Sequence, residues 1–451
     1  MLREIFPPFA NFRGSALFCL FMATHSYDTV RERFGHPWPE LNDGIVYSDT
    51  IKSNNPAALT LIGFYSSKYI DSAPLEGWLQ RIRNEQIKID NKVVTNPDTL
   101  LSIGSNLLYH RIPWKELDAP YMLDVLFEDS DMVAVNKPSG LQVLPGGLFQ
   151  QRTVLSQLQW RTYGPYCSSQ TLRLTSSSQV THPIPVHRLG RGTSGILLCA
   201  KTVHAKVHLA ACFADATSLA TKNRQSSEEL HIRRISKTYR ALATGILEKD
   251  EVLVKQPIGL MRYSGVASGI YVASSSGKPA ESRVKVLQRD FRMNCTLVQV
   301  EIYTGRPHQI RIHLSFIGHP LLGDPLYISS GGPKCFESES SVDIIGFKGF
   351  AQDGGHLRPS KPVPGDCGYH LHAHQLVLYH PTAYEEQQVE IMCTKGFCRG
   401  QLCIIDDHVK KKLPLFFSSF RLGHCSSEPL NKLFKGIIFF HLEIQSSFVC
   451  H

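Results

Sequence analysis

The chain has 451 residues, with 48 lysines and arginines against 39 aspartates and glutamates, so its formal net charge is +9. At roughly 150 residues per domain, this length predicts two or three domains. Hydrophobic residues make up 42% of the chain and charged residues 19%, which excludes a wholly disordered protein. The longest apolar run, residues 16–23, is far shorter than the about 20 residues that span a bilayer, so we expect no membrane insertion.

Residues 1–73 read as an N-terminal extension, with a weak candidate targeting segment at its start. Residues 74–112 are more regular, because apolar residues at helical spacing lead into a strand and a turn. The predicted helix would present Arg81 and Arg83 to phosphates. A solvated basic helix face explains the same residues equally well, and both interpretations stay open.

Residues 121–393 alternate strand-like apolar runs with glycine and proline turns, interrupted by helical stretches at 203–214 and 307–317. Because strands outnumber helices, we predict an α+β domain with a mixed or antiparallel central sheet. Residues 394–451 show no such alternation and form an unassigned C-terminal tail. Serine- and glycine-rich segments predict surface insertions near residues 165–180, 217–235 and 329–368.

The 12 cysteines are unevenly spread, which in a chain of this length favours reduced core thiols over a disulfide framework. Three of them precede a histidine with four residues in each gap, a wide spacing for zinc ligands: Cys393, Cys398, Cys403 and His408. Alternating histidines at 370, 372 and 374 would face one side of a strand, but that strand offers no carboxylate or cysteine at ligand spacing. We therefore expect no metal site.

One long stretch has a strongly asymmetric charge. From Met132 to Ala214 there is no aspartate or glutamate. The same stretch holds eight basic residues: Lys137, Arg152, Arg161, Arg173, Arg188, Arg191, Lys201 and Lys206. Such a surface attracts phosphate backbones, which favours a nucleic-acid partner. The alternative is that acidic residues from elsewhere fold over it.

Three segments carry candidate chemistry. VHRLGRGTSGILLCAK (186–201) reads as a loop entering a strand, where Gly190, Gly192 and Gly195 permit close backbone approach or positive φ. In TGRPHQIRIHLSFIGHPLLGDPLY (304–327), a helix opened by Pro307 would place His308 and Arg311 one turn apart. SKTYRALATG (236–245) places Tyr239 in a strand, where a tyrosine most often has a structural role.

In this order, and together with EDSDMVAVNKPSGLQVLPGG and LHAHQLVLYHP, these segments resemble the motifs of the RluA family of RNA pseudouridine synthases. Residues 74–112 resemble a degenerate form of the small RNA-binding module of the ribosomal protein S-four kind. The resemblance implies an isomerase that flips a uridine out of structured RNA, detaches its uracil, turns it and rejoins it through carbon. It implies no cofactor and no metal, and an RNA partner, either tRNA, rRNA or organellar RNA.

The resemblance also implies site roles. Arg188 would displace or replace the flipped base, and Tyr239 would pack on the uracil ring and assist proton removal. Arg311, or second Arg306, would pair with the catalytic carboxylate. The predicted RNA-binding residues are Arg188, Arg191, Lys137, Arg306, His308, Arg81 and Arg83.

The sequence departs from the family pattern at its central position, because the family's catalytic aspartate is replaced by Gly190. Three hypotheses follow. In the first, the chain is a working synthase with a carboxylate from a distant segment, such as Asp131 or Asp324. In the second, it is an RNA-binding relative without the chemistry. In the third, it differs from the functional protein by variation, error or alternative transcript. An acidic partner on Arg311 would favour the first. A plain RNA-binding module, which needs no pocket, is the hypothesis from outside the enzyme class.

Overall fold

The computed structural model describes residues 32–52, 59–164, 182–218, 235–263, 266–333, 355, 365–382 and 387–394. The candidate targeting segment lies outside these residues, as do most of the three predicted insertions, nearly all of the tail and the zinc candidates Cys398, Cys403 and His408. None of the helices in the described part is long and apolar enough to cross a membrane.

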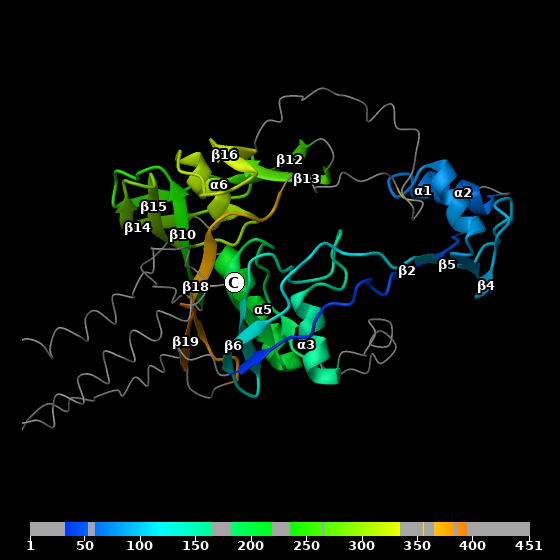
Figure 1. Ribbon diagram of the computed structural model, residues 1–451, viewed down its shortest axis with the longest axis horizontal. Helices are drawn as coiled ribbons and strands as arrows, with labels where there is room; N and C mark the ends of the chain where they lie inside the picture. Colours follow the sequence, from blue (N-terminus) through cyan, green and yellow to red (C-terminus); the bar gives the residue numbers. More distant parts are fainter. Residues whose placement is uncertain are drawn as a thin grey trace, which may run out of the picture. The chain divides into compact units, whose positions relative to one another are not determined.

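An 11-stranded sheet forms the centre of the described structure (Figure 1). Its order along the sheet is β1 (Glu32–Phe34), β6 (Leu123–Glu128), β7 (Met132–Lys137), β9 (Ser194–Ala200), β18 (Leu371–Tyr379), β10 (Ile235–Thr244), β15 (Cys295–Ile302), β14 (Ser282–Asp290) and β11 (Glu251–Val254). In addition, β8 (Ile184–Pro185) pairs with β9, and β19 (Gln388–Met392) pairs with β18. All these pairs are antiparallel except β9 with β18, which is parallel. The sheet is therefore mixed, and the α+β prediction is confirmed.

Strands β7 and β9 bury apolar residues on both of their faces, because both faces of the sheet are covered there. Alternate residues of a strand point to opposite faces. Val133 and Leu197 pack into one core cluster together with Val154 and Leu158 of α3 (Val154–Tyr163). Their neighbours in β7 and β9 pack into a second cluster with residues of α5 (Val203–Ser218). The sequence pattern predicted α5 but not α3.

The helix of the third segment starts later than expected. α6 (Gln309–Phe316) begins after His308, which lies in the left-handed region at φ 56°, so Pro307 sits in the preceding turn and does not open the helix. The side chain of Gln309 explains this turn, since its Oε1 accepts from the Arg306 backbone N–H at 3.0 Å and from Thr304 Oγ1 at 2.6 Å. Ile310 and Leu314 then bury one helix face in the sheet core.

Two hairpins accompany α6. They are formed by β12 (Ile258–Tyr263) with β13 (Val266–Ala273), and by β16 (Tyr327–Ser329) with β17 (Gly332–Pro333). Ile312 of α6 packs with Ile270 and Tyr327 from these hairpins in a separate buried cluster. One face of α6 thus rests on the sheet and another on the hairpins, which fixes the helix in place (Figure 1).

A second, four-stranded sheet belongs to a smaller module. Its order is β2 (Ile45–Thr50), β5 (Asn106–Arg111), β3 (Ile87–Ile89) and β4 (Lys92–Val93), and its helices are α1 (Leu61–Lys68) and α2 (Leu75–Arg83). Ile51, Leu61 and Tyr65 share its core with Trp78 and Ile82. These contacts correct the boundary predicted at residue 74, because the module already includes β2 and α1.

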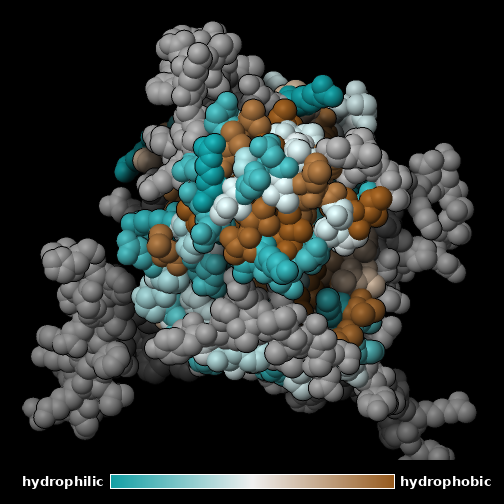
Figure 2. Space-filling view, turned by 90° about the vertical axis from the view of Figure 1, so that its right-hand side faces the viewer, coloured by the Kyte–Doolittle hydropathy of each residue, from teal (hydrophilic) through white to brown (hydrophobic). Residues whose placement is uncertain are grey.

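The module also corrects one predicted RNA contact. Arg81 is only 2% exposed, and its guanidinium carbon lies 4.5 Å from the centre of the Trp78 ring and 5.0 Å from that of Tyr109. Helical periodicity turns Arg81 inward with Trp78, where stacking on aromatic rings accommodates its charge. Arg83 is exposed and remains a predicted RNA contact. On the face seen in Figure 2, hydrophobic and hydrophilic residues are intermixed.

Candidate active site

A cavity of about 700 Å³ lies where the three motif segments meet. Its walls include the loop that precedes β9, Tyr239 of β10 and the turn that leads into α6. Residues 142–146 and residues 366, 369 and 371 also contribute to the lining. A volume in this range is typical of small-molecule sites. The structure therefore brings together three segments, of which the first and the last are more than 100 residues apart in the sequence.

A buried lysine holds the loop that carries Gly190. Lys137, at the end of β7, donates hydrogen bonds from Nζ to the carbonyl oxygens of Leu141 at 2.7 Å, Pro138 at 2.9 Å and Arg191 at 3.0 Å. Its side chain is fully buried, and this burial lowers the pKa of Lys137 to about 7. Lys137 thus joins two turns and cannot reach RNA, which corrects its predicted role as an RNA contact.

The same loop requires glycine where backbones approach closely. A Cβ on Gly192 would lie 2.6 Å from the Asp366 carbonyl oxygen, and Gly195, at φ +104°, would place one 2.3 Å from that of Ala373. Both distances are below any real Cβ contact, so larger residues would force the chains apart. The close-approach prediction is confirmed at these two positions, and the approach allows the parallel pairing of β9 with β18.

Gly190 differs from these glycines because its neighbour is a side chain. A Cβ on Gly190 would lie 2.9 Å from Tyr369 Oη and 3.4 Å from Thr193 Oγ1, two hydroxyl groups that are themselves hydrogen-bonded at 3.2 Å. The Tyr369 ring is buried, and its centre lies 4.3 Å from the guanidinium carbon of Arg311. Tyr369 therefore fills the space beside Gly190 that a larger residue would need.

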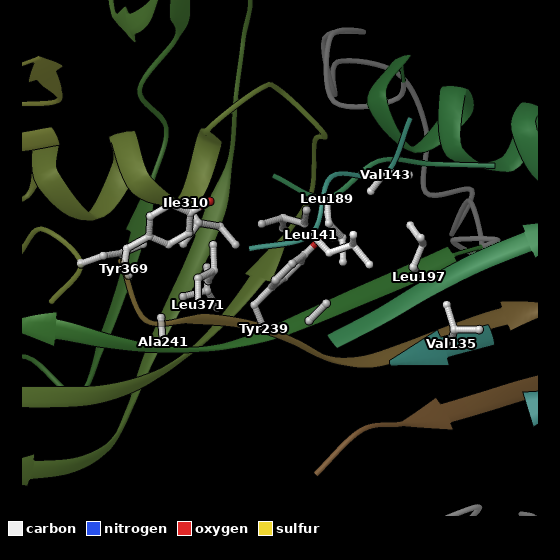
Figure 3. Packing of buried hydrophobic residues seen from close by; sticks show 14 of the residues in the cluster. Val135, Leu141, Val143, Leu189, Leu197, Tyr239, Ala241, Ile310, Tyr369 and Leu371 are labelled. Carbon is white, nitrogen blue, oxygen red and sulfur yellow. The ribbon is translucent and has the colours of Figure 1, made fainter. Parts of the chain in front are cut away.

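Tyr239 points from β10 into the hydrophobic core below the cavity, toward Leu141 and Leu189 (Figure 3). It is 9% exposed, and burial raises the pKa of its phenol to about 12. The hydroxyl group therefore stays protonated at neutral pH. An apolar ring at the cavity wall can pack on a base, whereas a phenolate base is not formed there.

Arg311 has a buried acidic partner. Its Nε donates to Asp324 Oδ2 and its Nη2 to Asp324 Oδ1, both at 2.7 Å, and the two side chains are 2% and 1% exposed. Burial works against the charge of Arg311, but the hydrogen bonds that it donates to Asp324 outweigh burial and raise the pKa of Arg311. Arg311 Nη1 has no hydrogen-bond partner among the described residues, and Arg311 lines the cavity. The N–H donors of Nη1 are thus left for a ligand.

Neither carboxylate considered as a substitute reaches the cavity. Asp324 is occupied by Arg311 and also accepts from the backbone N–H groups of Leu326 and Tyr327 at 2.9 and 3.1 Å. Asp131 directly precedes β7, and its backbone carbonyl oxygen accepts a hydrogen bond from the Lys201 N–H. This contact lies at the end of the β7–β9 pair opposite to the Gly190 loop. Six residues at ~3.3 Å each place it about 20 Å from the Gly190 loop. Neither Asp131 nor Asp324 lines the cavity, although Asp324 is the acidic partner on Arg311 that the hypothesis of a working synthase expected.

A different carboxylate faces the cavity. Asp366 accepts hydrogen bonds from Arg191, from Nε at 3.0 Å to each carboxylate oxygen and from Nη2 at 2.5 Å to Oδ1. Its side chain is 42% exposed, whereas that of Arg191 is 14% exposed. Arg191 was predicted as an RNA contact, but its charge is largely directed to Asp366. Sequence reasoning missed both Asp366 and Tyr369, because Asp366 lies at the end of the predicted insertion 329–368 and Tyr369 directly follows it.

The other predicted RNA contacts differ in their surroundings. Arg188 is exposed at the cavity wall. Arg306 also lines the cavity, and its Nε donates to the Pro279 carbonyl oxygen at 3.0 Å. His308 Nδ1 lies 2.8 Å from Tyr327 Oη, and burial, with help from Arg311, lowers the pKa of His308 to about 4. His308 is therefore neutral at pH 7 and offers hydrogen bonds but no charge.

The histidines of β18 form hydrogen bonds to the chain just after β19. His372 Nε2 and His374 Nδ1 both lie 2.9 Å from the Cys393 carbonyl oxygen, so these two side chains face one side, as their spacing predicted. Among the described residues, one group could hold a metal by position: Asp129, Asp131 and His380. His380 Nε2 lies 2.9 Å from Asp129 Oδ2, and Thr382 binds Asp131, so these atoms already satisfy one another.

A mixed sheet and a cavity that unites these three motif segments define the class of protein, and comparisons with known proteins agree. The family model described as RNA pseudouridylate synthase matches residues 131–316. RNA pseudouridine synthase 5 of Arabidopsis thaliana is 60% identical over 347 residues, which cover 77% of this chain and 92% of that protein. RNA pseudouridine synthase 5 of Oryza sativa subsp. japonica is 59% identical over 358 residues, covering 78% and 87%.

The chain belongs to the RNA pseudouridylate synthase family, which confirms the resemblance to the RluA type, and it is an isomerase that acts on RNA. Among solved structures, human RNA pseudouridylate synthase domain containing 1 matches with 22% identity and a TM-score of 0.39, covering 61% of this chain and 84% of that one.

Proposed function

We propose that the cavity receives a uridine flipped out of structured RNA and that the chain isomerises it to pseudouridine there. The observation that carries this proposal is the convergence of Arg188, Tyr239 and Arg311 on one cavity that retains an unpartnered N–H donor. A base can be reached by such a pocket only after it leaves its stack. Single-stranded nucleotides and the bases of loops are the RNA elements that permit this.

The residues take distinct roles in this proposal. The exposed Arg188 occupies the space that the flipped base leaves. The Tyr239 ring packs on the uracil, and Arg311 Nη1 donates a hydrogen bond to a uracil or ribose oxygen. Arg306 and the neutral His308 bind the RNA at the rim of the cavity. Residues 45–111, with Arg83 on their surface, act as an accessory RNA-binding module.

Gly190 favours a second candidate function, an RNA-binding relative that no longer converts uridine. Loss of a covalent nucleophile costs enzymes factors of roughly 10³ or more in rate. Such a protein would bind RNA with a steep salt dependence and leave its uridines unchanged.

Nucleoside mass spectrometry distinguishes the two functions. Purified protein is incubated with tRNA, rRNA and organellar RNA transcribed without pseudouridine, and the Arg188→Ala variant serves as the site control. Pseudouridine formed by the unmodified protein and reduced in the variant supports the enzyme. RNA binding without pseudouridine in any of the three classes would support the RNA-binding relative.

A further inference from the structure

We infer that Asp366 supplies the carboxylate that acts at the ribose C1′ of the flipped uridine. It takes the place of the catalytic aspartate that Gly190 replaces in this chain. This inference rests on the proposed function of the cavity. It concerns a residue at the end of a segment that sequence reasoning assigned to an insertion. Asp366 lies at the cavity wall, within the part of the chain that the structure describes.

The chemistry needs an anion beside the ribose. Breaking the bond between N1 and C1′ leaves positive charge on C1′ and the ring oxygen, and enzymes that cleave sugar bonds stabilise such charge with a carboxylate. Among the described residues that line the cavity, Asp366 is the single acidic one. Asp324 is 1% exposed behind Arg311, and Asp131 lies at the other end of β7.

Asp366 is attached to the loop that carries Gly190. Its backbone oxygen accepts from the Gly192 N–H at 3.1 Å, and its carboxylate receives both Nε and Nη2 of Arg191. Gly190 is thus followed directly by the residue that holds Asp366 in place. The segment that precedes β18 brings this carboxylate to the same loop. Asp366 therefore lies close to the Gly190 loop although the two are far apart in the sequence.

Arg191 orients this carboxylate without enclosing it. The Asp366 side chain keeps 42% of its surface exposed, and Arg191 Nε donates to its Oδ2 at 3.0 Å. A fork of two N–H donors fixes the plane of a carboxylate. Oδ2 therefore retains a lone pair for a reacting carbon, whereas both oxygens of the buried Asp324 are occupied.

The same segment explains why residue 190 is free to be glycine. Tyr369, three residues after Asp366, places its hydroxyl group 2.9 Å from where a Cβ of residue 190 would lie. The segment that carries Asp366 and Tyr369 thus supplies a carboxylate. It also fills the space that a side chain at residue 190 would need.

The step is balanced without a co-reactant. Asp366 Oδ2 bonds to C1′ while the bond from N1 to C1′ breaks, and its electron pair stays on the uracil. After the ring turns, C5 bonds to C1′ and the carboxylate leaves. The proton on C5 then passes to solvent and N1 takes one from solvent, so nothing is oxidised or reduced.

Single-turnover conversion of RNA by Asp366→Asn tests the inference. We expect a loss of roughly 10³-fold or more in the rate of pseudouridine formation, with the Kd for RNA changed less than threefold. Asp250→Asn is the matched control, because Asp250 also pairs with an arginine, Arg289, at 2.6 Å but lies outside the cavity lining. This control should retain the full rate.

A second variant guards against a folding defect. In Gly190→Asp/Tyr369→Phe/Asp366→Asn the carboxylate returns to residue 190, and we expect a rate at least tenfold above that of Asp366→Asn alone. Peptide mass spectrometry of acid-quenched reactions should also find RNA attached to the peptide that contains Asp366 in the unmodified protein.

Other results overturn the inference in distinguishable ways. Conversion by Asp366→Asn within fivefold of the unmodified protein means that Asp366 is not the reacting carboxylate, while the proposed function stands. Product from Gly190→Asp/Tyr369→Phe but none from the unmodified protein means that the pocket lacks a working carboxylate, so both proposals fail and the chain is an RNA binder.

Discussion

Gly190 and Tyr369 share one small space at the cavity wall. The Tyr369 hydroxyl group lies 2.9 Å from a Cβ built on Gly190 and is hydrogen-bonded to Thr193. Because the tyrosine ring is buried and contacts Arg311, the hydroxyl group cannot swing away easily. The two residues therefore have to change together.

We expect Gly190→Asp alone to destabilise the protein by about 1–3 kcal/mol, the usual cost of adding atoms to a packed site. Tyr369→Phe removes the clashing hydroxyl group, so the double variant should recover part of this loss. Urea unfolding of the two single variants and the double variant measures the coupling free energy. A coupling of zero would show that the two side chains do not share this space.

Tyr239 lines the cavity, and burial raises the pKa of its phenol to about 12. If its ring is the part that packs on the uracil, we expect Tyr239→Phe to retain pseudouridine formation within about tenfold, because the ring stays in place. Tyr239→Ala should lose far more, because the packing surface disappears. A Phe variant as inactive as the Ala variant would instead assign the chemistry to the hydroxyl group.

At the scale of elements, α6 and the turn after it are joined by the pair of Arg311 and Asp324. Both side chains are almost fully buried. Removing one partner of such a pair leaves an uncompensated charge and costs about 3–5 kcal/mol, whereas replacing both with apolar residues of similar size is often neutral.

We therefore expect Arg311→Met and Asp324→Leu each to lower the free energy of unfolding by about 3–5 kcal/mol, with the double variant much less affected. Thermal or urea unfolding of the three proteins checks this cycle. All three should be poor synthases, since Arg311 lines the cavity. Additive losses in stability would contradict the buried-pair account.

For the whole molecule, buried neutral histidines set the response to acid. Burial lowers the pKa of His313 and of His372 to about 4, from an ordinary value of 6.5. His313 is held between Ser282 Oγ and the Gln256 carbonyl oxygen, both at 2.9 Å. Between pH 6.5 and 4 the unfolded chain takes up protons that the folded chain refuses, so stability falls as the pH falls.

We expect the free energy of unfolding to decrease steadily from pH 6.5 to pH 4, by up to about 3 kcal/mol per histidine. His313→Gln keeps a donor and an acceptor but removes one titrating group, so its slope over this window should be shallower. Urea unfolding at closely spaced pH values measures both slopes. Equal slopes for the two proteins would show that His313 does not contribute.

Local pattern was sufficient for the strands and for α5, because alternating or continuous apolar runs determine which backbone geometry buries them. It failed for the start of α6, where the Gln309 side chain closes a turn that Pro307 alone did not indicate. It also failed for Arg81 and Lys137, since charge is visible in a sequence but burial is not.

The sequence by itself determined the family, the mixed α+β sheet and the absence of a carboxylate at residue 190, because motifs and apolar periodicity are local along the chain. Only the tertiary structure decided where acids and hydroxyl groups from distant segments come to lie. The parallel pairing of β9 with β18 brings residues 366–369 against the Gly190 loop across more than 170 positions. Contacts between such distant segments depend on strand order and close backbone approach, which one-dimensional patterns do not specify.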